Sequence, residues 1–323
     1  MKRTVVDSLA YRLINKDRRA LAQAITLVES TRPDHREEAQ SLLEALSPQK
    51  DTFRIGISGV PGVGKSTFID VFGSYLIEKG SRVAVLAIDP SSSLTHGSIL
   101  ADKARMQRLS ASSEAFIRPS PSGGVLGGVA SRTRDVLFLC EAAGFNIVLI
   151  ETVGIGQSET DVFDLTDMVF LLLPPAAGDE IQGLKKGIVE IADILLINKN
   201  DSGLEPICSQ TFQAYSSALK ITSPHNDFWK PTIHKISARE SMGLEGIWQD
   251  LQAYEQKAKS SGAWKKRRQA QNKLWFEEEV RSELWRAFHE KYESDLKNAE
   301  NAIYQSTSFP PSLAKELIKK LLN

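Results

Sequence analysis

The chain has 323 residues, of which 25% are charged and 41% hydrophobic, and this ordinary composition excludes disorder along its whole length. Its 40 Lys and Arg residues balance its 40 Asp and Glu residues, so the basic excess that is typical of nucleic-acid binding is missing. The length suggests about two domains, or one domain with appendages, and we expect no nucleic-acid partner.

Two cysteines, Cys140 and Cys208, lie far apart without a CxxC neighbour. This excludes a disulfide scaffold and an all-cysteine zinc site, and it is typical of a reducing compartment. The longest apolar run, residues 168–173, is much shorter than the ~20 residues of a membrane helix. The basic N-terminus lacks an apolar segment, and Asp7 and Asp17 argue against a transit peptide. We therefore predict a cytoplasmic location and no membrane partner.

Residues 7–47 carry apolar side chains at steps of three and four residues, the spacing of an amphipathic helix. Pro33 should separate two helices in this stretch, and Pro48 should end the second helix. We assign residues 1–50 to an N-terminal helical segment.

The pattern then changes to short apolar runs, at residues 53–58, 82–88, 147–151, 168–173, 194–198 and 232–236, and residues 116–118 are a further candidate strand. Nearly every position in these runs is apolar, as expected for strands that are covered on both faces. Stretches of helical period lie between most of them, at residues 67–78, 129–143 and 184–191. This alternation predicts an α/β fold with a mostly parallel sheet over residues 51–246.

After residue 246 the strand pattern stops. Residues 247–299 combine dense charge with large apolar side chains, which is typical of a long helix or helix pair with an apolar stripe. Such a stripe packs either on the preceding domain or on a second copy of the chain. We predict a homodimer and assign residues 247–323 to a C-terminal helical extension. The aromatic residues that carry the prediction are Trp264, Trp275, Phe276, Trp285 and Phe288.

The strongest motif is G-x-x-x-x-G-K-S between the first predicted strand and the following helix. Its glycines let the backbone wrap a phosphate, and the N–H groups with the helix N-terminus offer positive dipoles. Lys65 would add a full charge at the β- and γ-phosphates, and the Ser66 hydroxyl is a magnesium ligand in such loops. The predicted phosphate-binding residues are Gly59, Val60, Pro61, Gly62, Val63, Gly64, Lys65, Ser66 and Thr67.

A second motif, Asn198-Lys199-Asn200-Asp201, follows a predicted buried strand. The Asp201 carboxylate can accept hydrogen bonds from N1–H and the 2-amino group of guanine, whereas adenine offers neither donor. The Lys199 stem can lie along the base. After the last predicted strand, Ser237, Ala238 and Arg239 take the place where GTPases read the base through backbone N–H groups. These features predict GTP or GDP as the ligand of a P-loop NTPase G domain.

Acidic residues close two of the predicted strands. Glu151 begins E-T-V-G, in which the carboxylate is expected near magnesium and Gly154 near the γ-phosphate, although most GTPases have Asp here. Asp89 ends a strand at the same sheet edge, unless it only caps a turn before Pro90. Asp102 is a third candidate, with an exposed loop residue as the alternative. The predicted Mg²⁺ ligands are Ser66, Asp89, Asp102 and Glu151.

Longer blocks, DPSS, GSILADKARM, FIRPSPSGGVLGG, ETVGIGQSE, GDEIQGLKKGI and NKND, together resemble the MeaB/ArgK-type GTPases. These are methylmalonyl-CoA mutase-associated P-loop GTPases, also called lysine/arginine/ornithine transport ATPases. The resemblance runs from about Arg18 through Gly246, and the C-terminal helices resemble the family's dimerisation arm more loosely. It implies a homodimeric GTPase that chaperones an adenosylcobalamin-dependent acyl-CoA mutase, gating cofactor loading and protecting the mutase.

The resemblance also implies roles for single residues. Those matching Lys65, Ser66, Asp89, Asp102 and Glu151 surround the phosphates and magnesium in the family. The loop matching residues 177–188 acts as a switch that responds to the mutase, with Lys185 implicated. The predicted catalytic residues are therefore Lys65, Asp89, Glu151, Gly154 and Lys185. His96 and Ala101 replace family glycines, and their Cβ atoms should stiffen the loop that contains Asp102.

Three alternatives stay open at this point. A nickel or cobalt metallochaperone GTPase would need imidazole or thiolate ligands, and the five scattered His and two Cys residues disfavour it. An ATP-driven component or kinase of amino-acid transport is disfavoured by the N-K-x-D motif and by the lack of a kinase catalytic loop. A GTPase that only transmits signals would share the same motifs.

Overall fold

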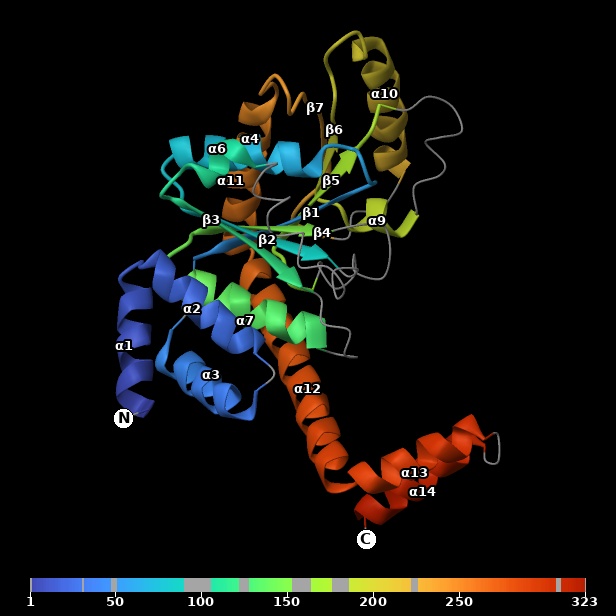
Figure 1. The fold of residues 1–323 in the computed structure, drawn as a ribbon. Helices are drawn as coiled ribbons and strands as arrows, with labels where there is room; N and C mark the ends of the chain where they lie inside the picture. Colours follow the sequence, from blue (N-terminus) through green and yellow to red (C-terminus); the bar gives the residue numbers. More distant parts are fainter. Residues whose placement is uncertain are drawn as a thin grey trace. The chain divides into compact units, whose positions relative to one another are not determined.

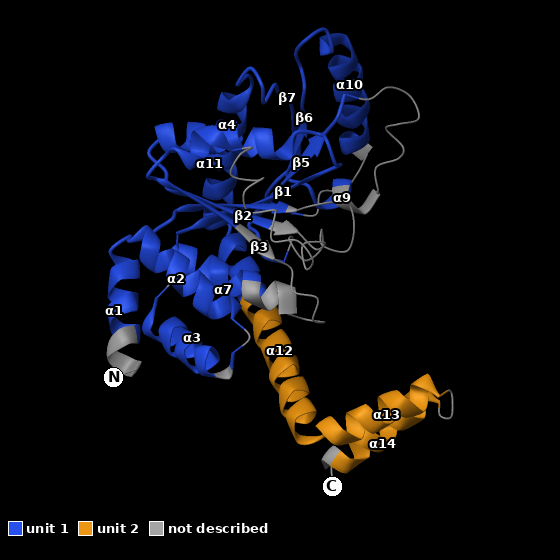
Figure 2. Cartoon of the chain, in the orientation of Figure 1, with its two compact units in different colours: residues 1–271 blue, residues 272–323 orange. Residues whose placement is uncertain are grey.

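The computed structural model describes residues 2–30, 32–47, 51–89, 106–121, 128–152, 164–175, 186–221, 226–305 and 309–322. It divides into two compact units, residues 1–271 and residues 272–323 (Figure 2). The first unit is built on one sheet, and the second is helical.

A seven-stranded sheet in the order β3-β2-β4-β1-β5-β6-β7 forms the centre of the first unit (Figure 1). Every neighbouring pair is parallel, which confirms the predicted α/β fold. The candidate strand at residues 116–118 is part of the longer β3. The strands are β1 Phe53–Gly59, β2 Val83–Asp89, β3 Ala115–Pro121, β4 Ile147–Thr152, β5 Met168–Leu173, β6 Ile194–Ile197 and β7 Thr232–Lys235.

Helices cover both faces of this sheet, as the continuous apolar runs predict. One face packs on α4 (Lys65–Glu78), α6 (Gln107–Ser110) and α11 (Leu244–Ser260). The opposite face packs on α7 (Gly128–Ala142) over β2 and β4, and on α9 (Lys186–Ile191) and α10 (Glu205–Ile221) over β5 and β6. Along β2, Val83 and Val85 join the first core and Ala84 and Leu86 the second, because successive side chains point to opposite faces.

The N-terminal segment contains three helices, α1 (Lys2–Ile14), α2 (Arg18–Glu29) and α3 (Pro33–Ala45), and not the two that the periodicity predicts. Pro33 is the first residue of α3, as predicted. The missed break lies before α2, where Lys16 has a φ of 66° and the Asp17 carboxylate accepts hydrogen bonds from the N–H groups of Arg19 and Ala20. Such a cap is worth about 1 kcal/mol. The apolar spacing continues across it and therefore hides it.

The C-terminal helices are α11, α12 (Ala263–Lys291), α13 (Glu293–Tyr304) and α14 (Pro310–Leu322), more than the predicted helix or helix pair. Gly262, with a φ of 74°, separates α11 from α12. Ile247, Leu251 and Tyr254 of α11 belong to the core of the sheet. No described helix is long and apolar enough to cross a membrane.

The first turns of α12 are fixed to the sheet of the first unit. The Arg268 guanidinium donates to Oδ2 of the buried Asp167 and to the Thr52 carbonyl, each at 2.7 Å. The Trp264 ring lies 5.3 Å from that of Phe53. One of the five aromatic residues of the predicted dimer stripe, Trp264, therefore packs on the chain's own sheet.

Candidate nucleotide-binding site

The loop between β1 and α4 has the backbone of a phosphate cradle. Gly62 and Gly64 have φ values of 77° and 99°, which L side chains rarely adopt. A Cβ atom at Gly59 would lie 2.5 Å from the Leu172 carbonyl oxygen, and one at Gly64 would lie 2.6 Å from Asn198 Nδ2. Glycine is thus required here both by conformation and by close packing against β5 and the end of β6.

The Lys65 side chain is buried beneath this loop. Its Nζ donates to the carbonyl oxygens of Gly59, at 2.7 Å, and of Val60, at 3.4 Å. Phosphate oxygens are stronger acceptors for an ammonium group than neutral carbonyls are. Lys65 is therefore held at the loop, where its charge can interact with a bound phosphate.

Ser66 and Glu151 come together at the start of α4. The Ser66 hydroxyl donates to Glu151 Oε1 at 3.1 Å, and Glu151 is buried at the end of β4. A hydroxyl and a carboxylate are the oxygen donors that Mg²⁺ prefers, so the residues that the structure describes fit this ion. In the sheet, Ala87 is paired with Glu151 and Ile88 with Thr152, so Asp89 follows at the same edge. The Asp89 side chain and all of Asp102, Gly154 and Lys185 lie outside the described residues.

Asn198 joins the phosphate side of the site to the base side. It follows β6, and its Nδ2 donates to the Val63 carbonyl at 2.8 Å. Its Oδ1 accepts a hydrogen bond from the Ala238 N–H at 3.0 Å. One buried amide therefore connects the phosphate loop to the segment Ser237–Arg239.

Asp201 and Ser237 form the base-reading side. The Ser237 hydroxyl donates to Asp201 Oδ2, and this bond holds the pKa of the Asp201 carboxyl below its ordinary value. The carboxylate therefore remains an acceptor at neutral pH, as recognition of guanine N1–H and the 2-amino group requires. Lys199 is exposed with a φ of 63°, and Arg239 is exposed in the turn after Ser237.

The described members of the predicted site thus follow the carboxyl ends of β1, β4, β6 and β7, where ligands bind to parallel sheets. The family model of methylmalonyl Co-A mutase-associated GTPase MeaB matches residues 21–293. The chain belongs to the MeaB family. It is a P-loop GTPase that binds guanine nucleotides.

Relatives of this MeaB-family chain agree with the assignment. A protein of Caulobacter vibrioides that is named as a GTPase is 50% identical over 285 residues, which cover 88% of this chain and 87% of the relative. The mitochondrial methylmalonic aciduria type A homolog of Mus musculus is 47% identical over 281 residues, covering 84% of this chain and 68% of the relative. A solved structure described as a LAO/AO transport system kinase has a TM-score of 0.76 and 33% identity, and covers 99% and 98% of the two chains.

Sequence reasoning missed two residues that support the site of this MeaB-family GTPase. Cys208 of α10 places its Sγ 3.9 Å from the Asn198 carbonyl and 3.7 Å from that of Lys199, and burial raises the pKa of its thiol. Asp70 of α4 accepts a hydrogen bond from the Leu109 N–H at 2.8 Å and so holds α6 against α4. The Asp70 bond joins residues 39 positions apart, and no motif marks either Asp70 or Cys208.

Proposed function

We propose that this GTPase is a chaperone of an adenosylcobalamin-dependent acyl-CoA mutase of the methylmalonyl-CoA mutase type, gating cofactor loading and protecting the mutase. The name of the matching family refers to association with that mutase, and the name of the mouse relative refers to methylmalonic aciduria. The observation that carries the proposal is the match of the family model over residues 21–293, which includes both the nucleotide site and most of α12.

In the proposed mechanism Ser66 and Glu151 would hold Mg²⁺, together with Asp89 and Asp102. Bound Mg²⁺ would neutralise the charge that develops on the transferred phosphoryl group. Lys65 adds a second cation at the phosphates, and the backbone of residues Gly59–Thr67 orients them. Asp201 selects guanine, with Lys199 along the base and Ala238 and Arg239 at its edge. Gly154 and Lys185 remain predicted members of the site.

We further propose that the protein is a homodimer joined through residues 272–323. Phe276 and Leu284 are 68% and 63% exposed and lie two helical turns apart on α12, with Val280 between them. Among the described residues of this unit, Phe288 is the single buried hydrophobic side chain. A unit of this size rarely folds stably with so small a core, so contact with a second copy would supply the missing burial.

The mutase assignment can be tested with purified components. The GTPase and the methylmalonyl-CoA mutase of the same organism would be mixed with GDP or with a non-hydrolysable GTP analogue, and binding would be followed by calorimetry. Adenosylcobalamin loading of the mutase would be followed by absorbance. We expect binding, and loading that depends on the nucleotide. No binding in either nucleotide state would contradict the proposal. The cytoplasmic location stays a prediction.

A further inference from the structure

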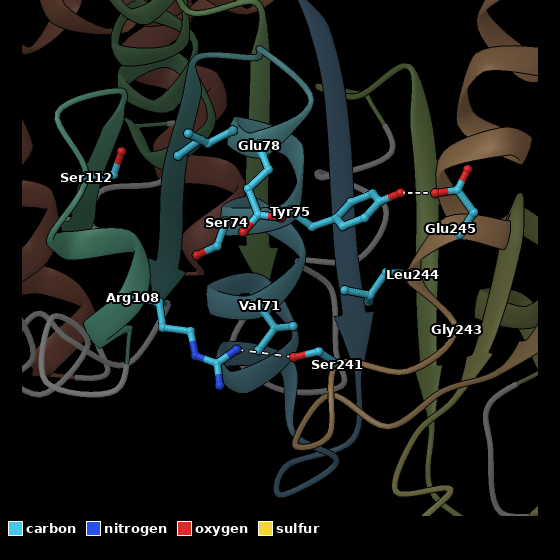
Figure 3. A pocket seen from close by; sticks show the side chains of 11 residues that line it. Val71, Ser74, Tyr75, Glu78, Arg108, Ser112, Ser241, Gly243, Leu244 and Glu245 are labelled. Carbon is cyan, nitrogen blue, oxygen red and sulfur yellow. Dashed lines mark hydrogen bonds between the residues drawn. The ribbon is translucent and has the colours of Figure 1, made fainter.

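A groove of about 580 Å³ lies on the outer side of α4, within the first unit (Figure 3). Its walls come from three elements: Val71, Ser74 and Tyr75 from α4, Arg108 from α6, and Leu244 from the start of α11. None of its lining residues belongs to the nucleotide site described above. The groove is therefore a separate feature of the surface.

Two of these walls nevertheless continue elements of the nucleotide site, and the third follows the segment that contains the predicted Asp102. The helix α4 begins at Lys65 of the phosphate loop, and the turn with Ser241 and Gly243 follows the base-side segment Ser237–Arg239. The third wall, α6, is the first described element after the segment that contains Asp102. A ligand that fills the groove would contact all three elements at once.

Specific bonds hold these walls together. The Asp70 carboxylate accepts hydrogen bonds from the backbone N–H groups of Arg108, at 3.4 Å, and Leu109, at 2.8 Å. A Cβ atom at Gly73 would lie 2.5 Å from Leu109 Cδ1, so α4 and α6 approach as closely as glycine permits. Across the groove, Arg108 Nη1 donates to Ser241 Oγ at 3.2 Å. The walls form one connected structure.

The groove carries opposite charges toward its two ends. Arg108, beside Val71 and Ser241, makes its side-chain hydrogen bond to a neutral hydroxyl (Figure 3). Within the described part of the chain, neither Arg108 nor Glu78 has an ion-pair partner, and both are exposed. Glu245, by contrast, accepts bonds from Tyr75 and, at 3.3 Å, from Lys79. The exposed Arg108 and Glu78 therefore flank an apolar floor, and Arg18 Nη1 donates to the Ser112 carbonyl at the edge of the groove, at 3.3 Å.

The spacing of these charges suits an extended peptide. Val71, next to Arg108, and Glu78 lie two turns apart on α4, about 10 Å along the helix axis. An extended chain covers that length in about three residues. The groove is open to solvent along its edge, where Glu78, Arg108, Ser241, Gly243 and Glu245 are exposed, unlike the enclosed cavities that bury small molecules.

We propose that this groove is a docking site for an extended segment of the client mutase. An acidic side chain of that segment pairs with Arg108, a basic side chain about three residues away pairs with Glu78, and an apolar side chain lies on Val71 and Leu244. The identity of the partner rests on the proposed function. Docking here would let the mutase act on the relative positions of the phosphate-side and base-side elements from outside the nucleotide site.

The test uses the full-length GTPase and purified methylmalonyl-CoA mutase from the same organism, titrated by calorimetry at two salt concentrations. Arg108→Glu and Glu78→Lys each reverse one charge, and Ser74→Trp fills the groove without changing charge. We expect each charge reversal to weaken mutase binding about fivefold or more, with a smaller salt dependence, and Ser74→Trp to weaken it at least as much.

Matched controls lie on helices that do not line the groove: Arg36→Glu and Glu37→Lys on α3 and Ser217→Trp on α10, where the Ser217 hydroxyl bonds to its own helix as that of Ser74 does. Unchanged mutase affinity in all three groove variants would overturn the docking site and leave the proposed function standing. So would equal weakening in the controls. If the wild-type chain does not bind the mutase in either nucleotide state, the proposed function fails, and the groove loses its partner with it.

Discussion

The two units of this GTPase differ in how their large and charged side chains are used. In residues 1–271 the aromatic and ionic groups of α11 and of the first turns of α12 are engaged with the sheet, as Tyr254 and Arg268 illustrate. In residues 272–323, by contrast, the large apolar side chains of Phe276, Leu284 and Trp285 are more than half exposed. An amphipathic pattern in the sequence thus shows that the apolar face of a helix must pack on something. Whether that face packs within its own unit depends on the fold.

This comparison predicts that the units can be perturbed separately. Changes at the nucleotide site should alter nucleotide chemistry and leave the molecular mass in solution unchanged. Changes on the exposed face of residues 272–323 should alter the molecular mass in solution and leave nucleotide chemistry unchanged.

Lys65→Ala should have the largest effect. It removes the cation at the phosphates, which we expect to slow hydrolysis about 10²–10³-fold and to weaken GTP binding by about 1.5–3 kcal/mol. A single-turnover assay measures the hydrolysis rate, and titration with a fluorescent nucleotide measures GTP affinity. Lys79→Ala, an exposed lysine at the end of the same helix, is the matched control. An unchanged single-turnover rate in Lys65→Ala would exclude Lys65 as the phosphate lysine.

Asp201→Asn should weaken GDP binding about 10–100-fold, because two hydrogen bonds to a charged acceptor are lost. Xanthine nucleotides, whose 2-oxo group can accept from an amide, should then be preferred. Ser237→Ala is the companion variant: it leaves the carboxylate and removes its hydroxyl partner, so its effect should be smaller. Calorimetry with GDP, XDP and ADP measures these differences. Equal affinity of the wild-type protein for ADP and GDP would refute guanine selection by Asp201.

Phe276→Glu combined with Leu284→Glu should convert the proposed dimer to monomers, since two carboxylates would have to be buried at the interface. Light scattering measures the mass, and basal hydrolysis should stay at the wild-type rate. Arg281→Glu adds negative charge to the same helix and serves as the control. Point variants are preferable to a truncation at residue 246, because such a cut would remove Ile247, Leu251 and Tyr254 from the core. A double variant with the mass of a dimer would contradict an interface at these residues.

Lys185→Ala should have the smallest effect on the isolated protein. We expect nearly wild-type basal hydrolysis and the loss of most of the acceleration caused by the mutase, since the proposed role of Lys185 requires that partner. The neighbouring Lys186→Ala is the control, and multiple-turnover assays with and without mutase give both rates. If basal and stimulated rates fall by the same factor, Lys185 acts in the basal site and does not depend on the mutase.

The phosphate loop and the sheet could be predicted because their requirements are local. Gly62 and Gly64 occupy backbone conformations that glycine alone adopts readily, and the buried strands are continuous apolar runs. The hydrogen bonds of Asn198 to Val63 and Ala238 could not be predicted from the sequence, because they join residues that are 135 and 40 positions apart. The sequence shows which residues of α12 are apolar. It does not show which of them are buried, because burial depends on the elements that lie opposite each side chain.

The two bonds of Asn198 have a kinetic consequence. Because one side chain supports both the phosphate loop and the base-side segment, the two halves of the site should not loosen independently, and their contributions to affinity should not add. A disturbance of either the phosphate loop or the base-side segment should therefore shorten the residence time of the whole nucleotide. A protein that accelerates nucleotide exchange would therefore need to contact only one of these two segments.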